Sequence, residues 1–118
     1  MSYDISFKVK AEGVDRWVNV GDCDANITWN LREMIEKSTG LPWKNGEDNG
    51  LCADIIPAIR TGLKELTENG EKYRKYNSPN GWGTVAGCKR FFETIIRSWE
   101  RLAMDDEEIA RIAHFWIE

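Results

Sequence analysis

The beginning of the chain alternates between apolar and polar positions in the way that is typical of strands. Ile5, Phe7 and Val9 fall on one face of residues 3–10, and charged or hydroxyl side chains fall on the other. A turn then leads into a second alternating stretch at residues 16–20. Together the two stretches predict a β-hairpin that packs one face against a core.

Apolar residues recur at helical spacing further along the chain. Residues 30–39 form the first such stretch, and Gly40 follows it in the position that usually ends a helix. A second helix is expected to begin close to Asp54, because Pro57 is tolerated only near a helix start. Residues 41–50 between these helices contain Pro and two Asn-Gly pairs, which predict a loop.

The longest helix is expected to follow Thr84, which is suited to cap it. Its apolar stripe is the strongest periodicity in the chain. We expect the stripes of the second and longest helices to form the core, through Ile55, Ile59, Leu63, Phe91, Phe92, Ile95 and Trp99.

The last residues are compatible with two structures. Asp105 and Glu108 have the spacing of a helix cap, whereas residues 112–117 alternate as a strand does. We expect a short helical turn followed by a last strand beside the hairpin, and a continuous helix is the alternative. Residues 1–118 are therefore predicted to form a single α+β domain, in which a small antiparallel sheet packs against three main helices.

Composition narrows the classes of partner. The formal net charge is −4, which argues against binding to duplex nucleic acid or to an anionic membrane surface. The chain has three cysteines, spaced too widely for a zinc motif and odd in number for a disulfide framework. No leader-like or membrane-spanning apolar run is present, so a cytoplasmic location is expected.

Two short motifs place amide, hydroxyl and indole groups where they suit ligand binding. The first motif, residues 26–30, reads Asn-Ile-Thr-Trp-Asn before a predicted helix, and the second motif, residues 80–83, reads Asn-Gly-Trp-Gly in a predicted turn. Glycines let a ligand approach the backbone, and the N–H groups at a helix start favour an anion. The candidate ligand-binding residues are Asn26, Thr28, Trp29, Asn30, Asn80 and Trp82, with the tryptophans as stacking surfaces.

A purely structural role for the same two motifs is the alternative interpretation. Asn30 with Glu33 has the form of a capping box, and Asn80 is suited to satisfy the backbone of a turn. Both tryptophans would then fill the core.

The order of these motifs resembles a scattered group of small, uncharacterised bacterial and phage proteins. The matching segments are Ser-Tyr-Asp-Ile at residues 2–5, the first motif, Glu-Lys-Tyr-Arg at residues 71–74, and the second motif. The resemblance implies a shared fold, a prokaryotic or phage origin, and a single site formed by the two motifs. It implies no particular activity.

Three other features of the sequence contain residue types that occur in binding or catalytic sites. Asp22, Asp24, Asn26, Asn30 and Glu33 have the spacing of a calcium-binding loop, but the position that requires glycine is isoleucine. His114, which is the only histidine, lies in an apolar segment and is interpreted as a packed or surface residue. A basic region formed by Lys72, Arg74, Lys75, Lys89 and Arg90 flanks the second motif and is interpreted as a solvated helix face that could also steer a phosphate.

These observations favour binding over catalysis, and no metal, cofactor or catalytic residue is expected. The first hypothesis is a small polar or nucleotide-like ligand held by the two motifs, which in a phage would serve counter-defence by sequestering a nucleotide signal. The second is an acidic inhibitor that blocks a basic groove on a host nuclease or another defence protein. A small enzyme is a minor alternative, and the oligomeric state is left open.

Overall fold

The computed structural model describes residues 2–13, 15–81 and 83–118, and these form an α+β structure, as the sequence predicts. The strands in these ranges are β1 (Ser2–Lys10), β2 (Trp17–Asn19), β3 (Asn26–Thr28), β4 (Glu47–Leu51) and β5 (His114–Ile117). The helices are α1 (Arg32–Thr39), α2 (Cys52–Glu68), α3 (Gly70–Tyr73), α4 (Val85–Asp105) and α5 (Glu107–Ile112), with the short 3-10 turns η1 (Trp29–Leu31) and η2 (Arg74–Tyr76).

The sheet is antiparallel and has the strand order β2-β1-β5-β4. β1 is long enough to pair with two strands along one edge. Its first residues pair with β3, where Ser2 lies opposite Thr28, and its last residues pair with β2, where Lys8 lies opposite Asn19. β5 pairs with the other edge of β1 and places Phe115 opposite Phe7.

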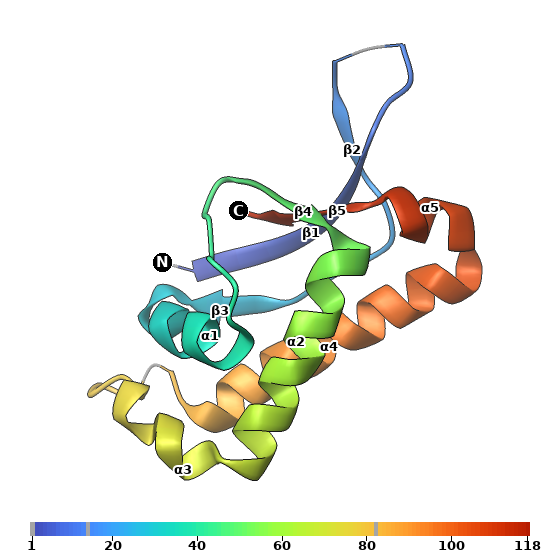
Figure 1. The fold of residues 1–118 in the computed structure, drawn as a ribbon. Helices are drawn as coiled ribbons and strands as arrows, with labels where there is room; N and C mark the ends of the chain where they lie inside the picture. Colours follow the sequence, from blue (N-terminus) through green and yellow to red (C-terminus); the bar gives the residue numbers. More distant parts are fainter. Residues whose placement is uncertain (1, 14, 82) are drawn as a thin grey trace.

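Helices α1, α2 and α4 lie on the same side of this sheet (Figure 1). Phe7, Phe115 and Ile117 of the sheet are buried on that side, and Ile59 and Phe92 of the helices are buried with them. The indole of Trp43 is also enclosed, and its ring meets Tyr3 and Phe115 edge-on. No helix in the described ranges is long and apolar enough to cross a bilayer.

Several predictions from the sequence pattern are confirmed. The hairpin is formed by β1 and β2, Gly40 ends α1 with a left-handed backbone (φ 75°), and Thr84 caps α4. The tail forms the short helix α5 and then the strand β5. The predicted core residues are buried, except that Leu63 and Trp99 are only partly covered.

Other boundaries were wrong. Residues 41–50 are not wholly a loop, because Glu47–Leu51 form β4 and pair with β5. α2 begins at Cys52, ahead of the predicted start, and Pro57 lies within it. The α5 cap is Asp106, whose carboxylate accepts a hydrogen bond from the Ile109 N–H (3.1 Å).

Candidate functional site

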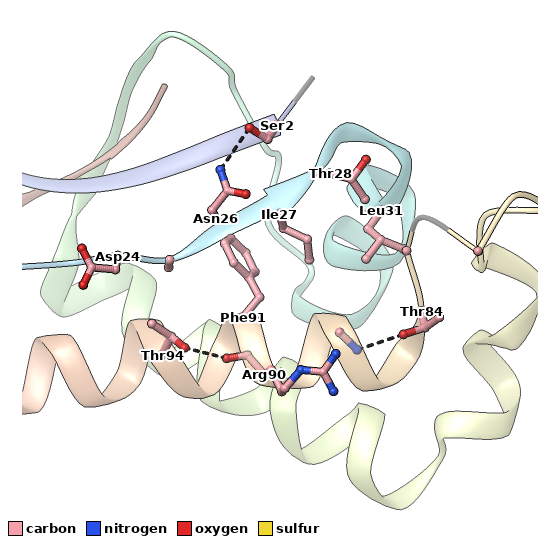
Figure 2. Close-up of a pocket in the computed structure, with 14 residues that line it drawn as sticks. Ser2, Asp24, Asn26, Ile27, Thr28, Leu31, Thr84, Arg90, Phe91 and Thr94 are labelled. Carbon is pink, nitrogen blue, oxygen red and sulfur yellow. Dashed lines mark hydrogen bonds between the residues drawn. The ribbon is translucent and has the colours of Figure 1, made fainter.

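A polar groove of about 610 Å³ runs between β3 and the first half of α4 (Figure 2). Ile27, Leu31 and Phe91 supply apolar lining, and each of them is mostly buried. The polar lining side chains are Ser2, Asp24, Asn26, Thr28, Thr84, Arg90 and Thr94. The residues that line the groove also include Gly81, Gly83 and Gly87.

The two motifs, which are about fifty residues apart in the chain, meet at this groove. A Cβ atom added to Gly83 would lie 2.9 Å from Leu31 Cγ and 3.1 Å from Thr28 Cγ2, so the second motif packs directly against the first. The backbone of Gly83 (φ 147°) also has a conformation that side chains rarely adopt. This contact therefore requires glycine for both space and conformation.

Polar contacts join the same two segments. Asn30 Nδ2 donates to Ser78 Oγ (3.4 Å), and the Ser78 hydroxyl donates to Asn80 Oδ1. Asn77, just before Ser78, accepts a hydrogen bond from the Val85 N–H at the start of α4 (3.1 Å). The turn that carries the second motif is thus bonded to η1 on one side and to α4 on the other.

The first motif divides between the groove and its surroundings. Asn26 and Thr28 line the groove. The Asn26 amide donates to Ser2 Oγ (3.0 Å) and Asp4 Oδ1 (2.6 Å), which fixes its orientation on the β1 edge. Thr28 accepts a hydrogen bond from the Asn30 N–H and caps η1, so the predicted capping role of Asn30 belongs to Thr28.

Trp29 lies outside the groove lining, with its ring stacked on Tyr3 (centroids 5.9 Å apart, planes at 29°). Its indole N–H donates to the Ser2 carbonyl (2.9 Å). The structure therefore places this tryptophan on the strand β1, not against a groove ligand. The other predicted stacking residue, Trp82, lies outside the described residues.

The helix α4 forms one whole side of the groove, and of its lining residues only Arg90 was associated with ligand binding from the sequence, as part of the basic region. Thr84, Gly87, Arg90 and Thr94 recur every three or four residues and so share one face. The side chains of Thr84, Arg90 and Thr94 lie across the groove from Asn26 and Thr28 (Figure 2). A glycine inside the most amphipathic helix of the sequence was the signal that could have pointed to this face.

Comparisons with protein-family models, curated proteins and solved structures find no match to this chain. Its chemistry must therefore be read from its own side chains. The groove offers hydroxyl and amide groups, one carboxylate at Asp24 and one guanidinium at Arg90. Among the described lining residues there is no His, Cys or Lys that could serve as a general base or strong nucleophile.

The predicted basic region is divided between two sides of α4. Arg90 lines the groove, whereas Lys72, Arg74 and Lys89 line a second hollow of about 670 Å³ beside α3. Lys72 lies 3.7 Å from Glu65 and Arg74 lies 3.3 Å from Glu71, so two of these charges are already paired within the chain.

The calcium-like spacing does not produce a cluster. Asn26 bonds to Asp4 and Asn30 bonds to Ser78, so the two amides are directed at different partners. Within residues 2–13, 15–81 and 83–118, no group of three or more His, Cys, Asp or Glu could hold a metal ion. His114 lies on β5, where Nδ1 is 2.9 Å from Asp48 Oδ2 and the ring meets Trp17 edge-on.

Proposed function

We propose that this protein is a non-catalytic binding protein that holds a small polar ligand in the groove between β3 and α4. The observation that supports this most is the meeting of the two motifs, because it forms a hollow lined by both. Capping and turn formation alone would not require the segments to share a groove. The groove volume of about 610 Å³ also falls in the range of small-molecule sites.

The lining supports a polar ligand and favours binding over turnover. Asn26 offers its side-chain carbonyl as an acceptor, because its amide hydrogens are directed at Ser2 and Asp4. Thr28 and Thr84 offer hydroxyl hydrogens. Strand pairing and helix packing hold the backbones of these residues at fixed positions. The apolar residues at the base contribute shape, since each of them is nearly covered by its neighbours. Such an arrangement orients a ligand without supplying the acid–base pair that most hydrolytic reactions need.

A nucleotide-like ligand and a phage setting extend this proposal through the resemblance described for the sequence. In that setting the protein would bind a nucleotide signal used by host defence and lower its free concentration. Arg90 supports this extension, because a guanidinium is suited to a phosphate.

The direct test is native mass spectrometry of the protein purified from the cells that make it. We expect a small molecule to be retained at one per chain by the wild-type protein. Asn26→Ala should lose it, whereas Asn45→Ala, which changes an exposed amide in the β4 loop, should keep it. Retention that is equal in both variants, or no retained molecule, would contradict a site at this groove.

A protein inhibitor is the second candidate, and one surface favours it. Residues 104–108, at the turn between α4 and α5, are all exposed. Met104, which is 87% exposed, is followed there by four successive acidic residues. An exposed apolar side chain beside concentrated negative charge suits a basic protein groove.

This candidate predicts a partner complex that is sensitive to salt and to the same carboxylates. Glu107→Gln with Glu108→Gln should weaken capture of the partner, while the equally charged control pair Glu12→Gln with Glu47→Gln should not. Asp106 is left unchanged because it caps α5. This role would be refuted if high salt did not weaken capture of the partner and the double variant captured it as well as the wild-type protein does.

A further inference from the structure

The groove contains a helix glycine that packing within the chain does not explain. Gly87 lies in the first turn of α4, and glycine is less favourable than alanine in a helix because its backbone loses more conformational freedom on folding. A Cβ atom added there would meet Thr84 Oγ1 at 3.4 Å and Arg90 Nη2 at 3.8 Å, both ordinary contact distances. By contrast, a Cβ atom at Gly62 would lie 2.7 Å from Thr39 Cγ2. Packing therefore accounts for Gly62 but not for Gly87.

What the glycine leaves open is the surface of the helix below Arg90. The two residues are three apart on α4 and so lie on one face, and the guanidinium is close to the space that a Cβ atom would take. An occupant of this space would contact the α4 backbone and the guanidinium together. The absence of a side chain at position 87 thus leaves more space beside the Arg90 guanidinium, which is the one cationic group among the described residues that line the groove.

The charge of Arg90 is not used within the described part of the chain. Its side chain is exposed and forms no ion pair with any residue in the described ranges, whereas Arg32 and Arg60 are paired with glutamates. A guanidinium carries five N–H donors in a planar fork that matches an oxyanion. A further contact of that oxyanion would come from the hydroxyl of Thr84, which lies beside Gly87 at the same end of the groove.

The groove also has a direction. Asp24 lies at one end and Thr84 at the other (Figure 2), so the Asp24 carboxylate is separated from the end where Thr84 and Gly87 lie. A ligand that is anionic at one end and donates hydrogen bonds at the other fits this polarity. A ligand with negative charge along its whole length does not.

We infer that the groove binds a small molecule end-on, with a phosphate or carboxylate held by Arg90 over Gly87 and hydrogen-bond donors directed towards Asp24. This inference rests on the binding function proposed above and assigns its ligand class. Arg90 becomes the residue that selects for the anion, and Gly87 the residue that admits it.

The test is a titration of the ¹⁵N-labelled protein, followed by NMR at constant ionic strength, with inorganic phosphate and separately with acetate. We expect saturable shifts at the Gly87 and Arg90 amides with at least one of the two anions, and the responding anion distinguishes phosphate from carboxylate recognition. Arg90→Gln should weaken that binding at least about tenfold, since it removes a charge-assisted contact. Gly87→Ala should weaken it also, without loss of thermal stability.

Arg101→Gln is the matched control, because it removes the same charge from an exposed position of α4 outside the groove. Shifts that fail to saturate with both anions, or that fall equally in Arg90→Gln and Arg101→Gln, would overturn the inference. A titration with adenosine, which is neutral, tests the proposed polar-ligand site independently of the anion assignment. Adenosine could cause saturable shifts at groove residues that Arg90→Gln leaves unchanged, while neither anion causes any. That result would support the polar-ligand site and overturn the anion assignment.

Discussion

The same substitution at two helix glycines is expected to change stability in opposite directions. Gly62→Ala adds a Cβ atom within 2.7 Å of Thr39 Cγ2 and 2.9 Å of Phe92 Cε2, where α1, α2 and α4 meet. Phe92 is fully buried, so its ring has no open space to move into. Helix propensity favours alanine by about 1 kcal/mol, but overpacking costs about 1–3 kcal/mol. Because both contacts are short, we expect a net loss of about 1–2 kcal/mol.

Gly87→Ala gains the same propensity without the clash, and we expect it to be stabilising by a few tenths to about 1 kcal/mol. Both variants replace glycine with alanine, so the effect of the substitution on the unfolded state largely cancels when the two are compared. Urea unfolding followed by tryptophan fluorescence measures both variants, and melting temperatures should separate by several degrees.

The m-values should be unchanged, because neither variant alters the surface exposed on unfolding. A stabilised Gly62→Ala would show that the three helices do not meet as tightly as the distances indicate. Equal losses in the two variants would show that Gly87 is needed for the fold, which would remove the argument that its absent side chain serves a ligand.

Four further outcomes follow from the structure. Phe92→Ala should cost about 3–5 kcal/mol in urea unfolding, since the ring is fully enclosed, and a loss below about 1 kcal/mol would contradict that packing. Thr84→Ala should cost about 1 kcal/mol in the same assay, because the hydroxyl caps α4 through the Gly87 N–H (3.0 Å). Burial and the Glu65 carboxylate, which accepts the hydrogen bond of Tyr73, raise the pKa of that phenol to about 12. Folding therefore favours the neutral phenol. The stability that this provides should be fully present below about pH 10, the unfolded pKa, and be lost as the pH rises through 12. Tyr73→Phe should make the free energy of unfolding less dependent on pH between those limits. Burial raises the pKa of all three thiols, but Cys52 and Cys88 are fully enclosed whereas Cys23 is only partly buried, so iodoacetamide should modify Cys23 first in the native protein, as mass spectrometry would show.

The regular elements were predictable where burial imposed a clear period. β1 and α4 each bury one face completely enough that the spacing of their apolar residues identifies them. β4 reads Glu-Asp-Asn-Gly-Leu and has no such period, because it is an edge strand held by pairing with β5. Its turn is fixed by Asn49, whose amide donates to the Lys44 and Glu47 carbonyls. Such contacts depend on the fold and leave little trace in hydrophobic pattern.

The start of α2 shows how a local rule was outweighed. Pro57 has no N–H to donate to the carbonyl of Ala53. Ala53 is exposed, so water can hydrogen-bond to this carbonyl instead. Pairing of the Cys52 N–H with the Ala113 carbonyl (2.9 Å) fixes the chain at the helix start. Tertiary contact therefore sets this boundary earlier than proline alone would suggest.

The candidate site was predictable only in part, for a similar reason. Asn26 and Thr28 were identified from the motif in which they occur, and the structure places them in the groove. On the α4 side Arg90 was noted only as part of a basic region, and the contribution of the other lining residues was missed, because it depends on the packing of α4 against β3. Trp29 shows the converse, since an aromatic residue in a polar motif has its ring stacked on Tyr3.

The position of β5 between β1 and β4 has a consequence for synthesis of the chain. Phe7 pairs with Phe115, so one edge of β1 has no native neighbour until residues 114–117 have left the ribosome. An unpaired strand edge of this kind invites pairing with other chains. We therefore expect nascent chains stalled before residue 114 to be protease-sensitive and to engage chaperones, even though the segments that form both motifs and all of α4 would already be translated.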